Sequence, residues 1–547
     1  MLQYTIKAPS RLRANIALPP SKSISNRALI LQALSGSAAF PENISECDDT
    51  KVMLQALELM PRVIDVGAGG TAMRFLTAYL SVTPGEHIIT GSQRMLHRPI
   101  GTLVDALRRM GAEIEYQGEA GYPPRAIRGK SLRGGHIDIP SDVSSQYISA
   151  LLMIAPTLKE GLELRLVGNV ASRPYIDLTL HVMHDYGAKA NWTDVDTITV
   201  SPGRYKPCRY RIESDWSAAS YWYEMLILSN DEEAVVSLGG LRDGSRQGDS
   251  MVRYIASLFG IRTIIERGDC NDSPHMVITK ALRPVQRLEY NFTNCPDLAQ
   301  TFIVACAALG IPFDFTGLGS LKIKETDRIE AMKTELRKIG VVIRDHDDRE
   351  LIWEGGHCDA TWEPFDTYND HRMAMALAPL ALIHGEVKIN NPQVVSKSYP
   401  NIGTTCASLD SSLNNTVMIY LIILIVALGI VCAAYEWLQQ RRGKSQAVVM
   451  PEQSSCATCD GVNAKCEQEC MMEAAVKDVV YFDDEELDAY KGRPSDQYTD
   501  KEAEEFADVM YTMRPEEVKE WNRSLIMRGI NMPNQIKDDF VTLASEG

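Results

Sequence analysis

The sequence predicts an α/β fold built from a repeated supersecondary unit. An amphipathic helix, a glycine and a strand follow one another at four places, with glycines spaced 76, 73 and 80 residues apart at Gly111, Gly187, Gly260 and Gly340. Glycine ends a helix readily because it adopts the left-handed backbone conformation without a steric cost. The same order of elements is common in α/β proteins in general, so the pattern fits either a true structural repeat or an ordinary α/β protein. Because 547 residues exceed what one hydrophobic core supports, about two to four domains are expected.

Charge is distributed unevenly along the chain. Residues 451–547 hold 10 Lys and Arg against 23 Asp and Glu, so −13 of the formal charge of −16 lies in this tail and only −3 in the first 450 residues. A nearly neutral body is free to concentrate cations in one cleft for an anionic substrate. No basic stripe indicates a nucleic-acid partner.

Cysteine usage and the N-terminal residues indicate a reducing compartment for the body. Eight of the twelve cysteines are scattered singly, as in reduced intracellular proteins, and disulfides are not expected there. Residues 1–18 contain no apolar segment typical of a secretory signal. The body is therefore expected to lie in the cytoplasm.

Residues 20–27, Pro-Ser-Lys-Ser-Ile-Ser-Asn-Arg, have an anion-binding composition. They lie between an alternating strand pattern and an apolar helix pattern that begins at Ala28. At such a strand-to-helix turn, free backbone N–H groups and the helix dipole favour a phosphate or a carboxylate. Lys22 supplies a point charge and Arg27 a bidentate fork, which together suit a ligand with more than one anionic group. A serine N-cap with solvated charges explains the same residues equally well.

Further segments with an anion-binding composition follow along the chain. Residues 67–74 are glycine-rich before a helix, which permits close backbone approach to a ligand, and Ser144, Ser145 and Gln146 precede another apolar run. Residues 324–328 read Lys-Glu-Thr-Asp-Arg, residues 369–375 read Asn-Asp-His-Arg-Met-Ala-Met, and Lys397 lies near the end of the body. Each phrase alone is a weak signal, because a glycine-rich turn is more often only a turn.

The pattern of the body stops near residue 400. A polar linker is expected over residues 406–416, and residues 417–435 carry no charge, which predicts a transmembrane helix at 417–438. A buried core helix is the alternative interpretation. Arg441, Arg442 and Lys444 follow the span, whereas no Lys or Arg lies between residues 398 and 440, so the tail is expected on the cytoplasmic side. This orientation conflicts with a cytoplasmic body, because a single span cannot leave both flanks on one side.

The tail, residues 439–547, is acidic and contains a cluster of cysteines. Four thiolates lie close enough to hold zinc or an iron-sulfur cluster, although no standard spacing is matched: Cys456, Cys459, Cys466 and Cys470. Unliganded thiols or disulfides explain them as well. Met418 stands at the edge of the apolar run, so residues 418–547 also fit a separate small membrane protein joined to the body by a fusion or frameshift, which would remove the conflict of topology.

Taken in order, the anion-binding phrases resemble the 3-phosphoshikimate 1-carboxyvinyltransferase (EPSP synthase) family from about residue 4 to residue 400, leaving the C-terminal 147 residues uncovered. The resemblance implies transfer of enolpyruvyl from phosphoenolpyruvate to shikimate 3-phosphate, a step of aromatic amino-acid biosynthesis, by a monomeric, cofactor-free and metal-free body. It implies two similar domains of three βαβαββ units each, with residues 1–18 plus 212–405 as domain I and residues 19–211 as domain II. Two asparagines usual in the family are replaced by Ala68 and Ser320, whereas every charged position is retained.

The resemblance also implies the roles of individual residues. Shikimate 3-phosphate would be bound by Lys22, Ser23, Arg27, Ser144, Ser145, Gln146, Ser172, Asp297 and Lys324. Phosphoenolpyruvate would be bound by Lys22, Gly70, Arg98, Gln146, Arg328, Arg372 and Lys397. Asp297 and Glu325 would be the acid and base carboxylates, with Lys22 as a third catalytic group. Two alternatives are a UDP-N-acetylglucosamine enolpyruvyl transferase and a catalytically silent, membrane-tethered metal-binding protein.

Overall fold

The computed structural model describes residues 2–37, 39–140, 144–168, 170, 172–266, 275–281 and 284–406, and in the tail residues 482, 484–495, 497–514, 517–518, 521–522, 524–525, 528–537, 539–540 and 543. The chain forms two compact units, residues 1–429 and residues 430–547, and each is described by itself. The predicted transmembrane helix at 417–438 and the four clustered tail cysteines lie outside the described residues. Among the described helices, none combines the length and the apolar character that a bilayer crossing needs.

Four sheets of the first unit share one topology, in which a parallel pair of strands is extended by two antiparallel strands. Two of them are β3-β4-β6-β5 (Val63–Asp65, Gly85–Thr90, Arg125–Gly129, Glu113–Tyr116) and β7-β8-β10-β9 (Gly135–Pro140, Leu162–Val167, Thr197–Val200, Ala190–Trp192). The other two are β2-β11-β13-β12 (Arg13–Ala17, Val235–Gly239, His275–Lys280, Ile261–Glu266) and β14-β15-β17-β16 (Leu288–Asn291, Phe313–Thr316, Glu350–Trp353, Arg344–His346). A further pair joins β1 (Gln3–Lys7) to β18 (Glu386–Asn390).

The predicted order of helix, glycine and strand is confirmed at all four positions. Gly111, Gly187, Gly260 and Gly340 have φ of 99°, 82°, 82° and 84°, the left-handed conformation that a residue with a Cβ adopts at a cost. They follow the helices α5 (Gly101–Arg109), α7 (Arg173–Asp185), α9 (Val252–Leu258) and α11 (Arg328–Arg337), and they precede β5, β9, β12 and β16. The mixed α/β fold and its repeat therefore follow from the sequence pattern.

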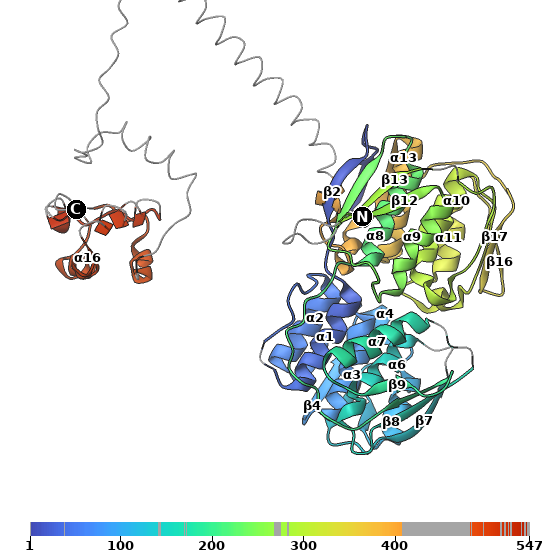
Figure 1. Ribbon diagram of the computed structural model, residues 1–547, viewed down its shortest axis with the longest axis horizontal. Helices are drawn as coiled ribbons and strands as arrows, with labels where there is room; N and C mark the ends of the chain where they lie inside the picture. The colour runs from blue at the N-terminus through green and yellow to red at the C-terminus, as the bar shows by residue number, and fades with distance from the viewer. Residues whose placement is uncertain are drawn as a thin grey trace, which may run out of the picture. The chain divides into compact units, whose positions relative to one another are not determined.

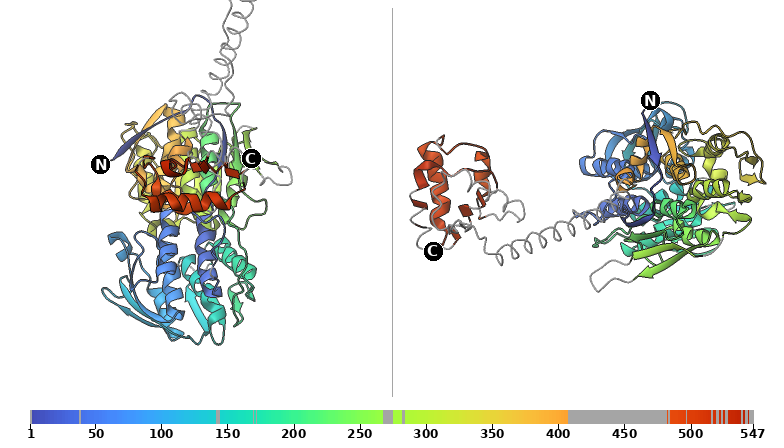
Figure 2. Two further views of the ribbon diagram at one scale, coloured as in Figure 1. Left: turned by 90° about the vertical axis from the view of Figure 1, so that its left-hand side faces the viewer. Right: turned by 90° about the horizontal axis from the view of Figure 1, so that it is seen from above.

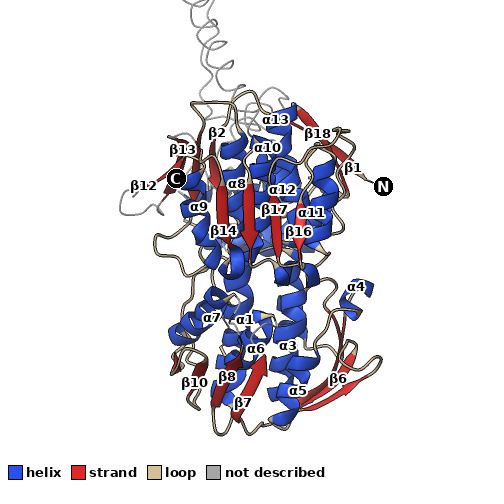
Figure 3. Cartoon of the chain, turned by 90° about the vertical axis from the view of Figure 1, so that its right-hand side faces the viewer, coloured by secondary structure: helices blue, strands red, loops and turns tan. Residues whose placement is uncertain are grey.

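The first unit contains two hydrophobic cores, which divide it into two halves (Figures 1 and 3). The core of the first half draws on residues 24–212, and the core of the second half draws on residues 12–18 and 216–402. The innermost helices are mostly apolar and are buried on nearly every side: α1 (Lys22–Ser35), α3 (Gly70–Val82) and α6 (Ser145–Ile154) in the first half, and α8 (Trp216–Leu228), α10 (Ala299–Leu309) and α12 (His371–Leu377) in the second. Helices of this composition pack in the interior, beneath the sheets.

Several of these inner helices begin at the junction of the two halves. In the first half, α1 starts at Lys22, α3 at Gly70 and α6 at Ser145. In the second half, α11 and α12 start at Arg328 and His371. The sequence phrases that carry cations and hydroxyls therefore lie at helix N-termini, where backbone N–H groups are free. The other described α-helices of the unit are α2 (Asp48–Leu59) and the short α4 (Gln93–Leu96) and α13 (Ala381–His384).

The described part of the second unit is a small helical body with a core of its own (Figure 2). Its helix α16 (Asp500–Thr512) begins with a capping box, in which Thr499 and Glu502 each accept a backbone N–H of the other. Phe506 and Trp521 are fully buried in the core. Trp521 Nε1 donates to Asp484 Oδ2 at 2.9 Å, and Asp484 also accepts Nη1 of the buried Arg528 at 2.7 Å. Because the buried carboxylate is paired, this body carries no uncompensated charge at that point.

Candidate active site

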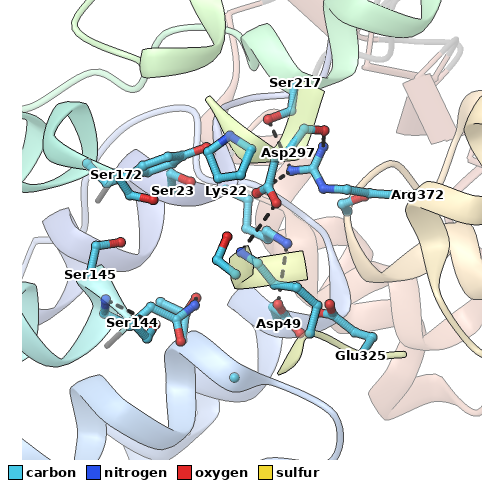
Figure 4. A pocket seen from close by; sticks show the side chains of 18 of the residues that line it. Lys22, Ser23, Asp49, Ser144, Ser145, Ser172, Ser217, Asp297, Glu325 and Arg372 are labelled. Carbon is cyan, nitrogen blue, oxygen red and sulfur yellow. Dashed lines mark hydrogen bonds and ion pairs between the residues drawn. The ribbon is translucent and has the colours of Figure 1, made fainter. Parts of the chain in front are cut away.

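A cleft between the two halves of the first unit gathers most of the candidate residues (Figure 4). Its described lining contains seven Lys or Arg side chains and four Asp or Glu side chains. An excess of cations at the start of several helices favours a ligand that carries more than one negative charge. One side of the cleft carries Ser144, Ser145 and Ser172, the other carries Asp297, Glu325 and Arg372, and Lys22 lies between them.

Lys22 begins α1, and its ammonium group faces the carboxylate of Asp49. Lys22 Nζ lies 3.4 Å from Asp49 Oδ2, and the Lys22 backbone N–H donates to Asp215 Oδ2 at 3.0 Å. Ser21 caps the helix, as a serine before an apolar run predicts. Burial alone would lower the pKa of Lys22, but Asp49, Cys47 and Glu325 together outweigh it and the pKa is raised. Lys22 therefore remains protonated at neutral pH, available to an anion.

Arg27 lies one turn further along α1 and is buried, with four hydrogen bonds to the protein. Its Nε donates to Thr179 Oγ1 at 2.8 Å, its Nη1 to the Ser23 carbonyl at 3.0 Å, and its Nη2 to Ser149 Oγ and the Tyr175 carbonyl at 3.2 Å each. Burial lowers its pKa to about 10, so it stays charged at neutral pH. Arg27 thus joins α1 to α6 and α7 while its guanidinium still lines the cleft.

Hydroxyl and amide groups of the first half line the same wall. Ser144 caps α6 by accepting the Gln146 N–H at 3.3 Å, and Gln146 Nε2 donates to Thr71 Oγ1 of α3 at 3.1 Å. Ser172 precedes α7 with a φ of 57°, and its N–H donates to the Thr293 carbonyl of the second half at 2.9 Å. The serines predicted from sequence are therefore brought together with Lys22 in one cleft.

Gly70 and Arg98 lie against each other at the start of α3. A Cβ built on Gly70 would stand 2.8 Å from Arg98 Nη1, so any side chain there would displace the guanidinium. Arg98 is 8% exposed, and its Nε has no hydrogen-bond partner among the described residues. The absence of a side chain at Gly70 leaves room for an anion beside Arg98.

In the second half, Asp297 is held by three cations. It lies in the short turn η4 (Pro296–Leu298), with Oδ2 2.9 Å from Arg372 Nη2, and Oδ1 3.1 Å from Arg328 Nη1 and 3.4 Å from Lys324 Nζ. Burial would raise the pKa of Asp297, but Arg372, Lys324 and Arg328 outweigh it and hold the pKa well below its ordinary value. Asp297 is therefore ionised at neutral pH.

Arg328 connects Asp297 to the second catalytic candidate, Glu325. The Arg328 side chain is 1% exposed, and its Nη2 donates to Glu325 Oε2 at 2.9 Å while its Nε donates to Asp370 Oδ2 at 2.7 Å. Lys397 Nζ donates to Glu325 Oε1 at 2.5 Å. Burial would raise the pKa of Glu325, but Lys397, Arg328 and Arg98 bring it well below its ordinary value. The carboxylates of this wall thus stand as counter-ions to the cations that an anionic substrate would use.

Asp49, Arg74 and the buried His371 also line the cleft, and Asp370 supports it through Arg328, although the sequence did not predict a role for any of the four. Burial, Lys22 and Lys397 hold the pKa of His371 well below its ordinary value, so its imidazole is neutral. The motifs at residues 67–74 and 369–375 include Arg74, Asp370 and His371, so these three could have been found from sequence. Asp49 had no such signal, because an acidic residue in the first turn of a helix is usual without a ligand.

Comparisons with known proteins agree with this geometry. The model of the EPSP synthase (3-phosphoshikimate 1-carboxyvinyltransferase) family matches residues 6–61 and 59–405. A 3-phosphoshikimate 1-carboxyvinyltransferase of Bacteroides fragilis is 53% identical over 401 residues, which cover 73% of this chain and 96% of the relative. One of Aliivibrio fischeri is 34% identical over 429 residues, covering 73% of this chain and 98% of the relative. In fold, the chain is similar to a solved EPSP synthase of Acinetobacter baumannii, with a TM-score of 0.60 at 22% identity, covering 74% of this chain and 98% of the other.

Proposed function

This chain belongs to the EPSP synthase family, and we propose that the cleft between its two halves performs the family's reaction with the residues described above. The enzyme transfers the enolpyruvyl group of phosphoenolpyruvate to the 5-hydroxyl of shikimate 3-phosphate and releases phosphate. The observation that carries the proposal is the fully buried Arg328, which pairs with both Asp297 and Glu325 in a cleft with an excess of cations. The two substrates bring two phosphates and two carboxylates, which match that excess.

The wall of the first half is proposed to bind the acceptor. The 3-phosphate and hydroxyls of shikimate 3-phosphate would be met by Lys22, Ser23, Arg27, Ser144, Ser145, Gln146 and Ser172, with Asp297 and Lys324 approaching from the second half. Arg27 contributes mainly by charge, because four of its N–H groups already bond to the protein. The phosphate and carboxylate of phosphoenolpyruvate would be met by Lys22, Gly70, Arg98, Gln146, Arg328, Arg372 and Lys397.

The chemistry needs one proton accepted and one proton donated. We assign Asp297 to the 5-hydroxyl, because it is ionised in the ligand-free protein, and its basicity would rise once the substrate anions engage its three cationic neighbours. It would then accept the hydroxyl proton as the oxygen attacks C2. We assign Glu325 to the methylene carbon, which gains a proton to give the tetrahedral intermediate. The intermediate then loses a proton from its methyl group and expels phosphate, so the vinyl group re-forms. Arg and Lys meet the charge on the departing phosphate, and no metal or cofactor enters these steps.

The two hydrophobic cores support a proposal for the domains. We propose that residues 1–18 with 212–405 form domain I, that residues 19–211 form domain II, and that they close on the substrates. Closure would exclude water from the cleft and strengthen every ion pair in it.

We expect phosphate release from phosphoenolpyruvate by the full chain only in the presence of shikimate 3-phosphate. The reason is that the acceptor hydroxyl must attack before phosphate can leave. The measurement is a phosphate assay with phosphoenolpyruvate alone, with shikimate 3-phosphate added, and with UDP-N-acetylglucosamine in its place. Release with the nucleotide sugar instead would point to the alternative transferase, and no release under any condition would count against catalysis by this cleft.

For the tail we propose that residues 417–438 cross a membrane and that residues 418–547 are a small membrane protein separate from a cytoplasmic catalytic body. The uncharged run and the basic residues after it support this, since they predict a span whose orientation conflicts with a cytoplasmic body joined to it. The family match ends at residue 405, which also agrees with a junction there. A metal at the four clustered tail cysteines is a further proposal, checked by metal analysis of the purified tail.

Antibody to the tail is expected to detect, in native cells, a band far below the 60.8 kDa of the whole chain, in the membrane fraction. The expected mass is that of residues 418–547 alone. Carbonate extraction is the control, because it removes peripheral proteins and leaves spanning ones. A single band at 60.8 kDa would contradict a separate product, and a soluble band would contradict the span.

A further inference from the structure

The guanidinium of Arg125 is buried in the first half, behind the wall of the cleft. Arg125 opens β6 (Arg125–Gly129) and has an exposed fraction of 0%. Its Nη2 donates to Thr77 Oγ1 and to the Met73 carbonyl at 3.3 Å, and it lies 3.0 Å from Met73 Sδ. Its Nε and Nη1 have no hydrogen-bond partner within the described part of the chain. Arg125 is thus a cation of the core rather than of the cleft surface.

No carboxylate among the described residues forms an ion pair with Arg125. The ionisable groups that face it are Arg74, Tyr116 and Tyr147. Burial first, and then repulsion by Arg74, lowers the pKa of Arg125 to about 9, so the side chain is still charged at neutral pH. A buried and unpaired charge is costly, and an apolar side chain of similar size would fill the same space at less cost. A charge that is kept at this cost is expected to act on a neighbouring part of the protein.

The contacts of Arg125 lead directly to the anion-binding wall. Met73 and Thr77, which accept its hydrogen bonds, lie on the turn of α3 that carries Arg74. Arg74 lines the cleft, and its Nη1 donates to the Gly70 carbonyl at 3.2 Å while its Nη2 donates to the Pro99 carbonyl at 3.0 Å. It thereby joins the loop of Gly70 to the segment that carries Arg98.

Arg98, Arg74 and Arg125 form a row of cations from the cleft into the core. Burial first, and then Arg98, lowers the pKa of Arg74 to about 10, which reports the repulsion along this row. Among the described residues, none of the three lies within ion-pair distance of a carboxylate oxygen, but the carboxylate of Glu325, which also pairs with Lys397 and Arg328, acts on both Arg98 and Arg74. Charges in a low-dielectric interior act over longer distances than in water, so the row raises the positive potential at its open end, beside Gly70.

We propose that Arg125 is a positioning residue of the cleft, whose buried charge acts through Arg74 to strengthen binding of the anionic donor substrate beside Arg98. The inference rests on the proposed function, since it takes phosphoenolpyruvate as that donor. In the ligand-free protein, Glu325 offsets only part of the repulsion among the three cations, because it is shared with Lys397 and Arg328, and a further anion at the open end of the row relieves the rest. Arg125 therefore lowers the stability of the ligand-free protein and raises the affinity for the ligand.

The test is the variant Arg125→Met, with Arg125→Gln beside it. Methionine removes the charge and fills the space, and glutamine removes the charge but keeps a hydrogen-bond donor in the same pocket. In both variants KM for phosphoenolpyruvate is expected to rise about tenfold, with kcat changed by less than about threefold. The first melting transition of the ligand-free protein is expected to rise by about 3–6 °C, because an unpaired buried charge has been removed. The further rise in melting temperature given by both substrates together is expected to shrink.

Arg128→Met is the matched control, because Arg128 lies on the same strand but is exposed and paired with Glu86. It should alter neither KM nor the melting temperature. The proposal would be overturned if Arg125→Met had a lower melting temperature and impaired kcat and KM, and if Arg125→Gln restored all three. That result would show that Arg125 only contributes a structural hydrogen bond. Unchanged KM in both variants beside an active wild type would overturn it and leave the proposed function standing. Absence of shikimate 3-phosphate-dependent release by the wild type would instead overturn the proposed function. If Arg125→Met fails to fold, Arg125→Gln alone decides between these results.

Discussion

We expect Glu325→Gln to lower kcat for phosphate release by about 10³-fold while KM for phosphoenolpyruvate does not rise. A positioned proton donor contributes about 10²- to 10⁴-fold, and glutamine keeps the shape of the side chain but cannot supply that proton. In the proposed site the carboxylate of Glu325 also competes with the substrate for Lys397 and Arg328, to which it bonds, so its neutralisation would free both cations. Steady-state kinetics at saturating shikimate 3-phosphate measure the two constants separately.

The same variant tests how Glu325 becomes protonated. In the ligand-free protein the pKa of Glu325 is well below its ordinary value, because Lys397, Arg328 and Arg98 outweigh burial. When the phosphate and carboxylate of phosphoenolpyruvate engage these cations, the pKa of Glu325 should rise, and the complex takes up a proton at neutral pH. Calorimetry in two buffers of different ionisation enthalpy measures the uptake.

Glu330→Gln is the matched control for Glu325→Gln, because Glu330 lies on α11 nearby but is exposed and paired with Lys333. It should keep both kcat and the proton uptake of the wild type. Equal proton uptake by the wild type and Glu325→Gln would sink the assignment of the titrating group to Glu325. A kcat within about threefold of the wild type would remove Glu325 from the list of proton donors.

The order of elements was accessible from the sequence because short-range rules govern it. A glycine after an amphipathic helix reports a left-handed residue, and all four such glycines end a helix before a strand. Likewise Ser21, Ser144 and Asp327 cap helices, as small polar residues before apolar runs predict. These features depend on neighbours within one turn, so a single sequence contains the information.

The pairing of charges was not accessible in the same way. Arg328 meets Asp297, which is 31 residues away, and Asp370, which is 42 residues away, and no local pattern encodes those distances. Arg125 is a stronger case, because arginine is almost never fully buried without a partner and a reader of the sequence would place it on the exposed face of its strand. Long-range packing decides both, so the candidate residues could be named from sequence while their counter-ions could not.

Arg328→Met is expected to lower the free energy of unfolding of the first unit by about 3–5 kcal/mol and to abolish measurable phosphate release. Removing one partner from a buried ion-pair network leaves the others as uncompensated charges, which costs about this much. Arg328 is 1% exposed and bonds to Asp297, Glu325 and Asp370, so one substitution disturbs three carboxylates. Denaturant unfolding followed by the fluorescence of the buried Trp216 and Trp222 measures the loss, and Arg337→Met, at the exposed end of the same helix, is the control.

The pH dependence of stability distinguishes an electrostatic role of Arg328 from a role in packing alone. In the wild type the pKa values of Asp297 and Glu325 are depressed, so their contribution to stability is fully present above the ordinary carboxyl pKa of about 4 and is lost as pH falls through the depressed values. Between pH 5.5 and 7.5 these two groups therefore leave the wild-type stability flat. In Arg328→Met, Asp297 keeps Arg372 and Lys324, and Glu325 keeps Lys397, but both carboxylates lose a guanidinium. Their folded pKa values therefore rise toward the unfolded ones, and the stability that their ionisation contributes at neutral pH shrinks. The loss of stability caused by Arg328→Met should thus be smaller at about pH 3 than at pH 7, because the contribution of the ionised carboxylates fades below their ordinary pKa of about 4. An equal loss at both pH values would mean that Arg328 acts by packing alone.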